Sequence, residues 1–304
     1  MSEYILKVTN LTKFYNNVKV LDEVSFTIEQ GKIYGFIGEN GAGKTTTIRI
    51  LAGLSEATQG KIEILGQTEK KQLEAVRKNI GILVEKPILY DTLSAAENMN
   101  MQCILYGQKN TTIVPQLLEK VGLTNVKKKK VKDFSLGMKQ RLGIAMAMVQ
   151  EPKLLILDEP VNGLDPLGMV EIRELLKSLN KEYGITIIIS SHILTQLYQL
   201  ATDYIIIHKG KIVELRTLEE LNDKCRKHIH IETDEALKAI EIIRMKLGTE
   251  NYEIVSENTI KLYDCMDDVK NVAKILFDGG ILVTRFTLVG QNLEEYYIDL
   301  FGGK

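Results

Sequence analysis

The sequence predicts an α/β fold, a mostly parallel sheet covered by helices, followed by a smaller α+β unit. Three observations support this prediction. Up to about residue 220, short apolar runs typical of buried strands alternate with helical patterns. A glycine-rich loop separates one of these runs, 33–37, from the helical pattern that follows it. Beyond about residue 220 the expected elements follow the order βαββαβ, which is typical of a ferredoxin-like unit.

The first elements are two strands with alternating apolar and polar residues, predicted over 4–10 and 24–30. They lie on either side of the turn signal Asn16-Asn17. The apolar run at 33–37 predicts a buried strand, and 45–54 a helix. This part of the chain is therefore expected to form a strand–loop–helix unit after two half-buried strands.

The middle of the chain, residues 94–150, has Met, Leu and Ala at helical spacing. A buried strand at 154–157, a helix at 168–183 and a strand at 185–190 are expected to follow. Strands at 204–208 and 211–215 flank Gly210 and predict a closing hairpin. Alternating strands and helices favour a parallel sheet with both faces covered.

The last unit is predicted to have strands at 228–232, 252–255, 259–262 and 281–287, and helices at 234–246 and 267–277. An amphipathic stretch at 292–300 follows these elements. The change in pattern predicts a boundary between 216 and 225, hence domains at 1–220 and 221–304.

Composition limits the function classes. The 304 residues include 39 Lys and Arg against 40 Asp and Glu, which gives a formal charge of −1. This charge disfavours nonspecific electrostatic binding to nucleic acid or to anionic lipid. The three cysteines show no CxxC spacing, which disfavours a disulfide framework or a zinc site. No apolar run approaches the ~18–20 residues that span a bilayer. We therefore expect an intracellular protein, either soluble or peripheral on the inner side of a membrane.

The glycine-rich loop fits the phosphate-binding pattern GxxxxGK[ST] in full. Glycines let backbone N–H groups converge on phosphate oxygens, and the start of the following helix adds partial positive charge. Lys44 is expected to reach the β- and γ-phosphates, and the Thr45 hydroxyl to bind Mg²⁺. The pattern predicts a nucleoside triphosphate site made of Gly38, Glu39, Asn40, Gly41, Ala42, Gly43, Lys44, Thr45 and Thr46.

An acidic pair, Asp158-Glu159, ends the apolar run at 154–157. A carboxylate at the carboxyl end of a strand in such a sheet is expected to lie beside the phosphate-binding loop. Asp158 is predicted to hold Mg²⁺, and Glu159 to act as general base on the attacking water.

Between these motifs lies SLGMKQR, which opens an apolar-rich helical pattern. With it, the chain resembles an ATP-binding cassette (ABC) ATPase whose signature motif is a variant of LSGGQ. The resemblance implies the P-loop NTPase fold of ABC type, with an antiparallel β subdomain and a helical subdomain at about 87–150. It also implies that the signature contacts ATP held by a second subunit. The signature residues would be Ser135, Leu136, Gly137, Met138, Lys139 and Gln140.

Three further residues match the family's motifs. Tyr15 corresponds to the aromatic residue that stacks on adenine, with Phe14 as the weaker candidate. Asp165 lies in a stretch similar to the D-loop, which couples the two sites of a dimer. His192 resembles the histidine that contacts the γ-phosphate, and the catalytic residues would be Glu159, His192 and Glu85.

Glu85 departs from the family pattern, which usually has Gln at this place. A carboxylate there could still bind Mg²⁺ or orient water, although it adds negative charge beside phosphate. The combination of Glu85 with the SLGMKQR signature is similar to the pattern of one branch of the family, which exports bacitracin or lantibiotics for resistance or immunity. The alternative is a loop residue without special chemistry.

Two function classes follow from the resemblance. The first is a transport ATPase that uses ATP and Mg²⁺ and lies at the cytoplasmic face of a bacterial membrane. It would work with an integral membrane permease and a second nucleotide-binding subunit, which is either another copy of this chain or a different cassette. The second is a soluble ABC ATPase that acts on nucleic acid or ribosomes. The single phosphate-binding loop, the lack of long heptad repeats and the charge of −1 favour the first class and no nucleic-acid partner.

Overall fold

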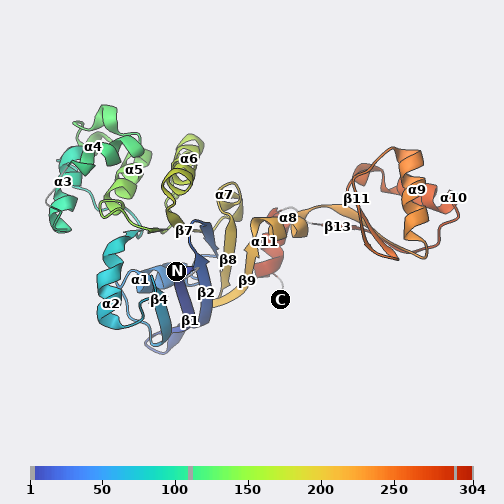
Figure 1. Ribbon diagram of the computed structural model, residues 1–304, viewed down its shortest axis with the longest axis horizontal. Helices are drawn as coiled ribbons and strands as arrows, with labels where there is room; N and C mark the ends of the chain where they lie inside the picture. Colours follow the sequence, from blue (N-terminus) through green and yellow to red (C-terminus); the bar gives the residue numbers. More distant parts are fainter. Residues whose placement is uncertain (1–3, 109–111, 291–292, 303–304) are drawn as a thin grey trace. The chain divides into compact units, whose positions relative to one another are not determined.

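The computed structural model describes residues 4–108, 112–290 and 293–302. The chain divides into two compact units, residues 1–218 and 219–304, which are described separately (Figure 1). No helix in these described ranges is both long and apolar enough to cross a membrane.

The first unit contains a six-stranded sheet. Five strands are parallel and the last is antiparallel, which confirms the predicted mostly parallel sheet. Three of its strands, at 33–37, 154–157 and 186–191, are buried along their whole length, as their apolar runs predicted. The spatial order is β5 (Ile80–Leu83), β6 (Leu154–Leu157), β7 (Thr186–Ser191), β3 (Ile33–Ile37), β8 (Asp203–His208) and β9 (Lys211–Thr217).

A second sheet in this unit is antiparallel, with the order β2 (Val18–Glu29), β1 (Tyr4–Tyr15), β4 (Gln59–Ile64). The turn at Asn16-Asn17 is where the sequence predicts it, but both strands of the hairpin are longer than expected. Register shifts between Val8 and Phe14 interrupt the period-two alternation, which explains why the pattern indicated only part of each strand. Neither β4 nor the helix α2 (Lys70–Val76) was predicted.

Helix α1 (Lys44–Leu51) follows the phosphate-binding loop. Its residues Ile48 and Leu51 belong to one apolar cluster with Phe26 of β2 and Phe36 of β3. The two phenyl rings lie 5.9 Å apart, at a tilt. Because this cluster includes residues of both sheets, the helix that begins at the loop is anchored to both.

The helical region contains α3 (Ala95–Leu105), α4 (Ile113–Lys120) and α5 (Leu136–Ala147), which Figure 1 shows together in green, apart from the blue antiparallel sheet. Ser94 and Glu97 form a capping box that fixes the start of α3. The chain then continues through α6 (Pro166–Tyr183) and α7 (Leu194–Tyr198).

The second unit has the predicted βαββαβ order. Its elements are α8 (Leu218–Cys225), β10 (His228–Thr233), α9 (Ala236–Leu247), β11 (Tyr252–Ser256), β12 (Thr259–Leu262), α10 (Val269–Asp278), β13 (Val283–Val289) and α11 (Leu293–Gly302). The antiparallel sheet has the strand order β11-β12-β10-β13, and α9 and α10 contact each other and share one core with the strands. This arrangement confirms the ferredoxin-like expectation.

Candidate functional site

The phosphate-binding loop requires its glycines. Gly41 and Gly43 have φ values of 82° and 111°, which side chains with a Cβ rarely adopt. At Gly38, a Cβ would lie 2.4 Å from the Ile207 carbonyl oxygen of β8. The loop runs from β3 to α1, so Gly38, Glu39, Asn40, Gly41, Ala42 and Gly43 form the connection, and Lys44, Thr45 and Thr46 open the helix.

Lys44 is buried, with 4% of its surface exposed. Its Nζ donates to the carbonyl oxygens of Gly38 at 2.7 Å and Glu39 at 3.1 Å, and lies 3.5 Å from Glu159 Oε1. Burial lowers the pKa of Lys44, while the carboxylates of Glu159 and Asp158 oppose this shift. The loop and the acidic pair are therefore in direct contact, as the sequence predicts.

Asp158 is buried at the end of β6, where Ser190 of β7 holds it. The Ser190 hydroxyl donates to Asp158 Oδ1 at 2.6 Å and accepts a bond of 2.8 Å from the Glu159 backbone N–H. One hydroxyl thus fixes both members of the acidic pair. Sequence reasoning did not identify this role, although the switch from apolar to polar residues at the end of β7 was a signal.

Glu159 has a left-handed backbone with φ of 48°, a strained conformation of the kind that clusters at functional sites. Its Oε2 lies 3.1 Å from His192 Nδ1 and accepts a bond of 3.2 Å from Asn162 Nδ2. Glu159 and His192, which were predicted separately as catalytic residues, are therefore in contact. Asn162 was not predicted, since an amide three residues after a carboxylate is common in any turn.

A cavity of about 480 Å³ lies at this place, and we call it the nucleotide cavity. It brings together the helix start after the phosphate-binding loop, the acidic pair, Glu85 and the start of α5. Its lining is Thr45, Glu85, Lys86, Leu136, Gln140, Asp158, Glu159, Asn162 and Gly163. Hydroxyl and carboxylate oxygens are the ligands that Mg²⁺ prefers, so Thr45, Asp158 and Glu85 form a suitable donor set.

Glu85 lies just beyond β5 with φ of 59°. Its carboxylate pairs with a residue that the sequence analysis missed, Arg49 of α1, and Arg49 Nη2 lies 2.6 Å from Glu85 Oε1. No local pattern links these two residues, because their contact depends on the fold.

The signature segment begins α5. Ser135 is the N-cap, and its Oγ accepts a bond of 3.2 Å from the Met138 N–H. Leu136 is 41% exposed, and a Cβ at Gly137 would have one neighbour, Leu164, at 3.9 Å. The first turn of the helix is therefore accessible, as contact with a second molecule would require. Farther along, Lys139 pairs with Asp91 at 3.1 Å, and Gln140 is buried.

The two remaining predicted residues are Asp165 and Tyr15. Asp165 is the N-cap of α6 and accepts a bond of 3.1 Å from the Gly168 N–H. Tyr15 ends β1, is 44% exposed and lies beneath Lys13 Nζ, 4.8 Å from the ring centre. Tyr15 is not among the described residues that line the nucleotide cavity.

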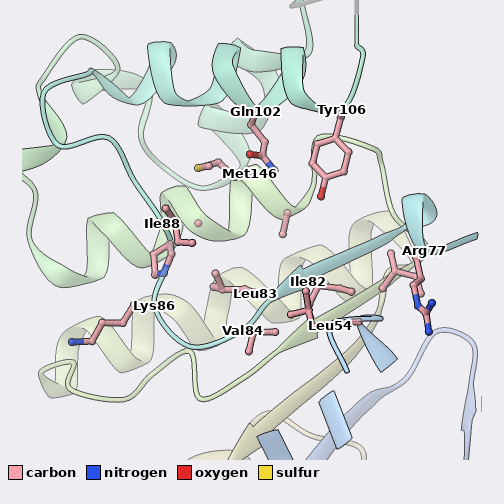
Figure 2. Close-up of a pocket in the computed structure, with 15 residues that line it drawn as sticks. Leu54, Arg77, Ile82, Leu83, Val84, Lys86, Ile88, Gln102, Tyr106 and Met146 are labelled. Atoms are coloured by element: carbon pink, nitrogen blue, oxygen red, sulfur yellow. The ribbon is translucent and has the colours of Figure 1, made fainter. Parts of the chain in front are cut away.

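A second hollow, of about 410 Å³, lies between β5, α3 and α5, and we call it the apolar groove. Figure 2 shows Gln102 and Tyr106 reaching toward it from the end of α3, and Ile82 from β5. Ile88 on its rim is 88% exposed and Leu54 is 69% exposed. Large apolar side chains exposed around one groove are typical of an interaction surface.

Comparisons with known proteins agree with this geometry. The family model described as ABC transporter matches residues 21–162. The bacitracin transport ATP-binding protein BcrA of Bacillus licheniformis is 42% identical over 98% of both chains. The lantibiotic transport ATP-binding protein SrtF of Streptococcus pyogenes is 49% identical over 69% of this chain and 89% of its own length.

Among solved structures, a dimeric ATP-binding cassette in a post-hydrolysis state, bound to ADP and Pi, has a TM-score of 0.62. It is 25% identical, and the match covers 70% of this chain and 98% of that chain. Full-length similarity to BcrA, the phosphate-binding loop in contact with the acidic pair, and this fold lead to one conclusion. The chain belongs to the ABC transporter family, as one of its ATP-binding and ATP-hydrolysing subunits.

Proposed function

We propose that this subunit powers a separate membrane permease that exports a peptide antibiotic of the bacitracin or lantibiotic type, for resistance or immunity. The observation that carries the proposal is the 42% identity to a bacitracin transport protein over 98% of both chains. The 49% identity to a lantibiotic transport protein supports the same branch.

The proposed hydrolysis uses residues whose contacts are described above. Lys44 and the loop N–H groups bind the phosphates. Thr45 and Asp158, joined by Glu85, would hold Mg²⁺, and the ion would offset the charge of the phosphates. Glu159 takes the proton of the attacking water, and His192, at 3.1 Å, orients the Glu159 carboxylate. Tyr15 stacks on the adenine ring.

A second cassette completes the site in this proposal. The exposed start of α5, with Ser135 and Gly137, directs N–H groups and a positive helix end outward, which suits the γ-phosphate of ATP on a partner cassette. Asp165, at the start of α6, would lie near the same interface. A dimeric solved relative supports this arrangement. ATP would close the pair and hydrolysis would reopen it.

The permease is proposed to dock in the apolar groove by short helices on its cytoplasmic side, which would place this subunit at the cytoplasmic face of a bacterial cell membrane. Ile88, Leu54 and Tyr106 supply exposed apolar surface there, and Lys86 lines both the groove and the nucleotide cavity. A helix seated in the groove would therefore contact a segment that also borders the nucleotide.

The extent of the match favours the bacitracin type of transporter within this branch. SrtF aligns over 89% of its own length but only 69% of this chain, whereas BcrA aligns over 98% of both. A larger share of this chain therefore has a counterpart in BcrA than in SrtF.

The test combines docking with resistance. The chain is expressed with its permease in a sensitive strain, and growth is measured against bacitracin and against a lantibiotic. Ile88→Asp should lower both the recovery of the permease with the tagged subunit and the resistance, while ATP binding is retained.

The matched control is Ile104→Asp, which alters an apolar residue that is 67% exposed on α3 and absent from the groove lining. It should change neither readout. Recovery of the wild-type chain with ribosomes or nucleic acid and without a membrane protein would contradict the proposed function.

A further inference from the structure

The two-residue segment Glu85-Lys86 separates the two hollows. Glu85 lines the nucleotide cavity, and Lys86 lines both the nucleotide cavity and the apolar groove. Glu85 also has a left-handed backbone, with φ of 59°. Such a conformation persists only where the surroundings hold it, so the direction of this segment is set by its contacts.

Arg49 provides such a contact from the phosphate-binding helix. Thr45 and Arg49 are four residues apart on α1 and therefore lie on the same face. Thr45 lines the nucleotide cavity with Glu85, and Arg49 Nη2 lies 2.6 Å from Glu85 Oε1. The ion pair thus connects the helix that carries the nucleotide loop to the segment between the hollows.

The negative charge of the nucleotide cavity gives a physical reason for the ion pair between Arg49 and Glu85. Asp158 and Glu159 already line the cavity, and a third carboxylate at position 85 adds repulsion toward the phosphates of a nucleotide. The Arg49 guanidinium supplies an opposite charge to that third carboxylate. A glutamine at position 85 would need no such partner.

We propose that Arg49 is a positioning residue of the nucleotide site, which neutralises Glu85 and holds its carboxylate at the boundary between the nucleotide cavity and the apolar groove. The inference rests on the proposed role of this cavity in binding ATP. If Glu85 also takes part in holding Mg²⁺, as proposed above, its carboxylate would have two competing partners. Nucleotide binding with Mg²⁺ would then change the contacts of the Glu85-Lys86 segment.

Arg49 also lies in the last turn of α1, where any cation stabilises the helix dipole. That effect does not depend on Glu85. A double-mutant cycle separates the two roles, because the dipole effect is the same in both backgrounds while the proposed effect disappears without the carboxylate.

The experiment measures equilibrium binding of a fluorescent, non-hydrolysable ATP analogue, without Mg²⁺ and during a Mg²⁺ titration. The proteins are wild type, Arg49→Ala, Glu85→Gln and the double variant. Arg49→Ala should weaken Mg²⁺-free binding and lower the Mg²⁺ concentration for half-saturation, each by about twofold to fivefold, the scale of one half-exposed ion pair. In the Glu85→Gln background, the same substitution should change neither value.

Two further variants guard against a folding defect. Arg49→Lys keeps a positive charge opposite the Glu85 carboxylate, so both values should lie closer to those of the wild type than they do in Arg49→Ala. Lys70→Ala is the control, because it removes an ion pair of the same 2.6 Å length with Glu56 on the exposed surface. It should leave nucleotide binding unchanged.

Equal effects of Arg49→Ala in both backgrounds, or no effect in the wild type, would overturn the role of Arg49. That result would leave the proposed function intact as long as the wild type binds the analogue with Mg²⁺. Failure of the wild type to bind it would instead refute the nucleotide site itself.

Discussion

The cassette, residues 1–218, buries the charged side chains of Lys44 and Asp158, whereas no described Asp, Glu, Lys or Arg of the C-terminal unit, residues 219–304, is buried. Lys44 and Asp158 are 4% and 2% exposed and are held by a carbonyl at 2.7 Å and a hydroxyl at 2.6 Å. In the C-terminal unit, the charged groups that pair are largely exposed. Glu232, for example, pairs with His230 at 3.1 Å and Arg285 at 3.5 Å, and its side chain is 38% exposed.

This difference in the burial of charge distinguishes a functional site from an ordinary solvent-exposed surface. A buried charge costs free energy unless partners satisfy it, so a chain that keeps several together is maintaining chemistry there. An exposed ion pair contributes little, and its presence says little about function. We therefore expect substitutions of the same type to have large effects in the cassette and small ones in the C-terminal unit.

The largest expected effect is that of Glu159→Gln on ATP hydrolysis. Loss of the general base should lower the rate by about 10²- to 10⁴-fold, while ATP still binds. Steady-state phosphate release and analogue binding measure the two quantities. Glu232→Gln, the same substitution in the C-terminal unit, should leave the rate unchanged. Hydrolysis by Glu159→Gln at the wild-type rate would remove Glu159 as the base.

Lys44→Ala should weaken nucleotide binding by about 10- to 100-fold, since it removes charge-assisted hydrogen bonds to phosphate. Titration with a fluorescent analogue provides the measurement. Lys261→Ala is the matched control, because Lys261 pairs with Glu253 at 3.3 Å and is partly exposed in the C-terminal unit. Unchanged affinity of Lys44→Ala would contradict the assignment of the phosphate-binding loop.

Ser190→Ala should lower the free energy of unfolding by about 1–3 kcal/mol, because it leaves buried Asp158 without its hydroxyl donor. It should also slow hydrolysis by displacing the acidic pair. Urea unfolding checks the first effect, with Ser256→Ala in β11 as the exposed control. Equal stability of the two variants would mean that the Ser190 contact contributes nothing.

The smallest effect is expected for Arg285→Ala, which breaks an ion pair of 3.5 Å whose side chains are 61% and 38% exposed. The free energy of unfolding should change by less than about 1 kcal/mol, and the effect should weaken further at high salt. A larger loss in the free energy of unfolding that does not depend on salt would show that this pair contributes more than an exposed ion pair does.

The two units also differ in how far the sequence predicts them. In the C-terminal unit, regular strands and helices allowed the βαββαβ order from β10 to β13 to be predicted, whereas the helix α8 was missed. In the cassette, β4 and α2 were missed. The strands of the first hairpin were predicted too short, because register shifts between Val8 and Phe14 disturb the alternation of apolar and polar residues. Periodicity predicts an element only where the element is regular.

The site shows a similar division. The phosphate-binding loop and the acidic pair each occupy adjacent residues, so both motifs can be read from the sequence. Each follows a buried strand, and this place at the carboxyl end of a strand predicts their contact. Ser190, Asn162 and Arg49 were missed because their roles depend on partners that only the fold brings close. Arg49 has an ordinary place on the face of a helix, and only the 2.6 Å contact with Glu85 distinguishes it.

The central claim is that this chain is one half of a pair that ATP closes. The most direct test measures the molar mass of Glu159→Gln by light scattering during gel filtration, with Mg²⁺ and ATP, with ADP, and without nucleotide. We predict a dimer only with Mg²⁺ and ATP, and a monomer throughout when Lys44→Ala is added. A Glu159→Gln protein that binds ATP and yet remains a monomer at every concentration would contradict the account.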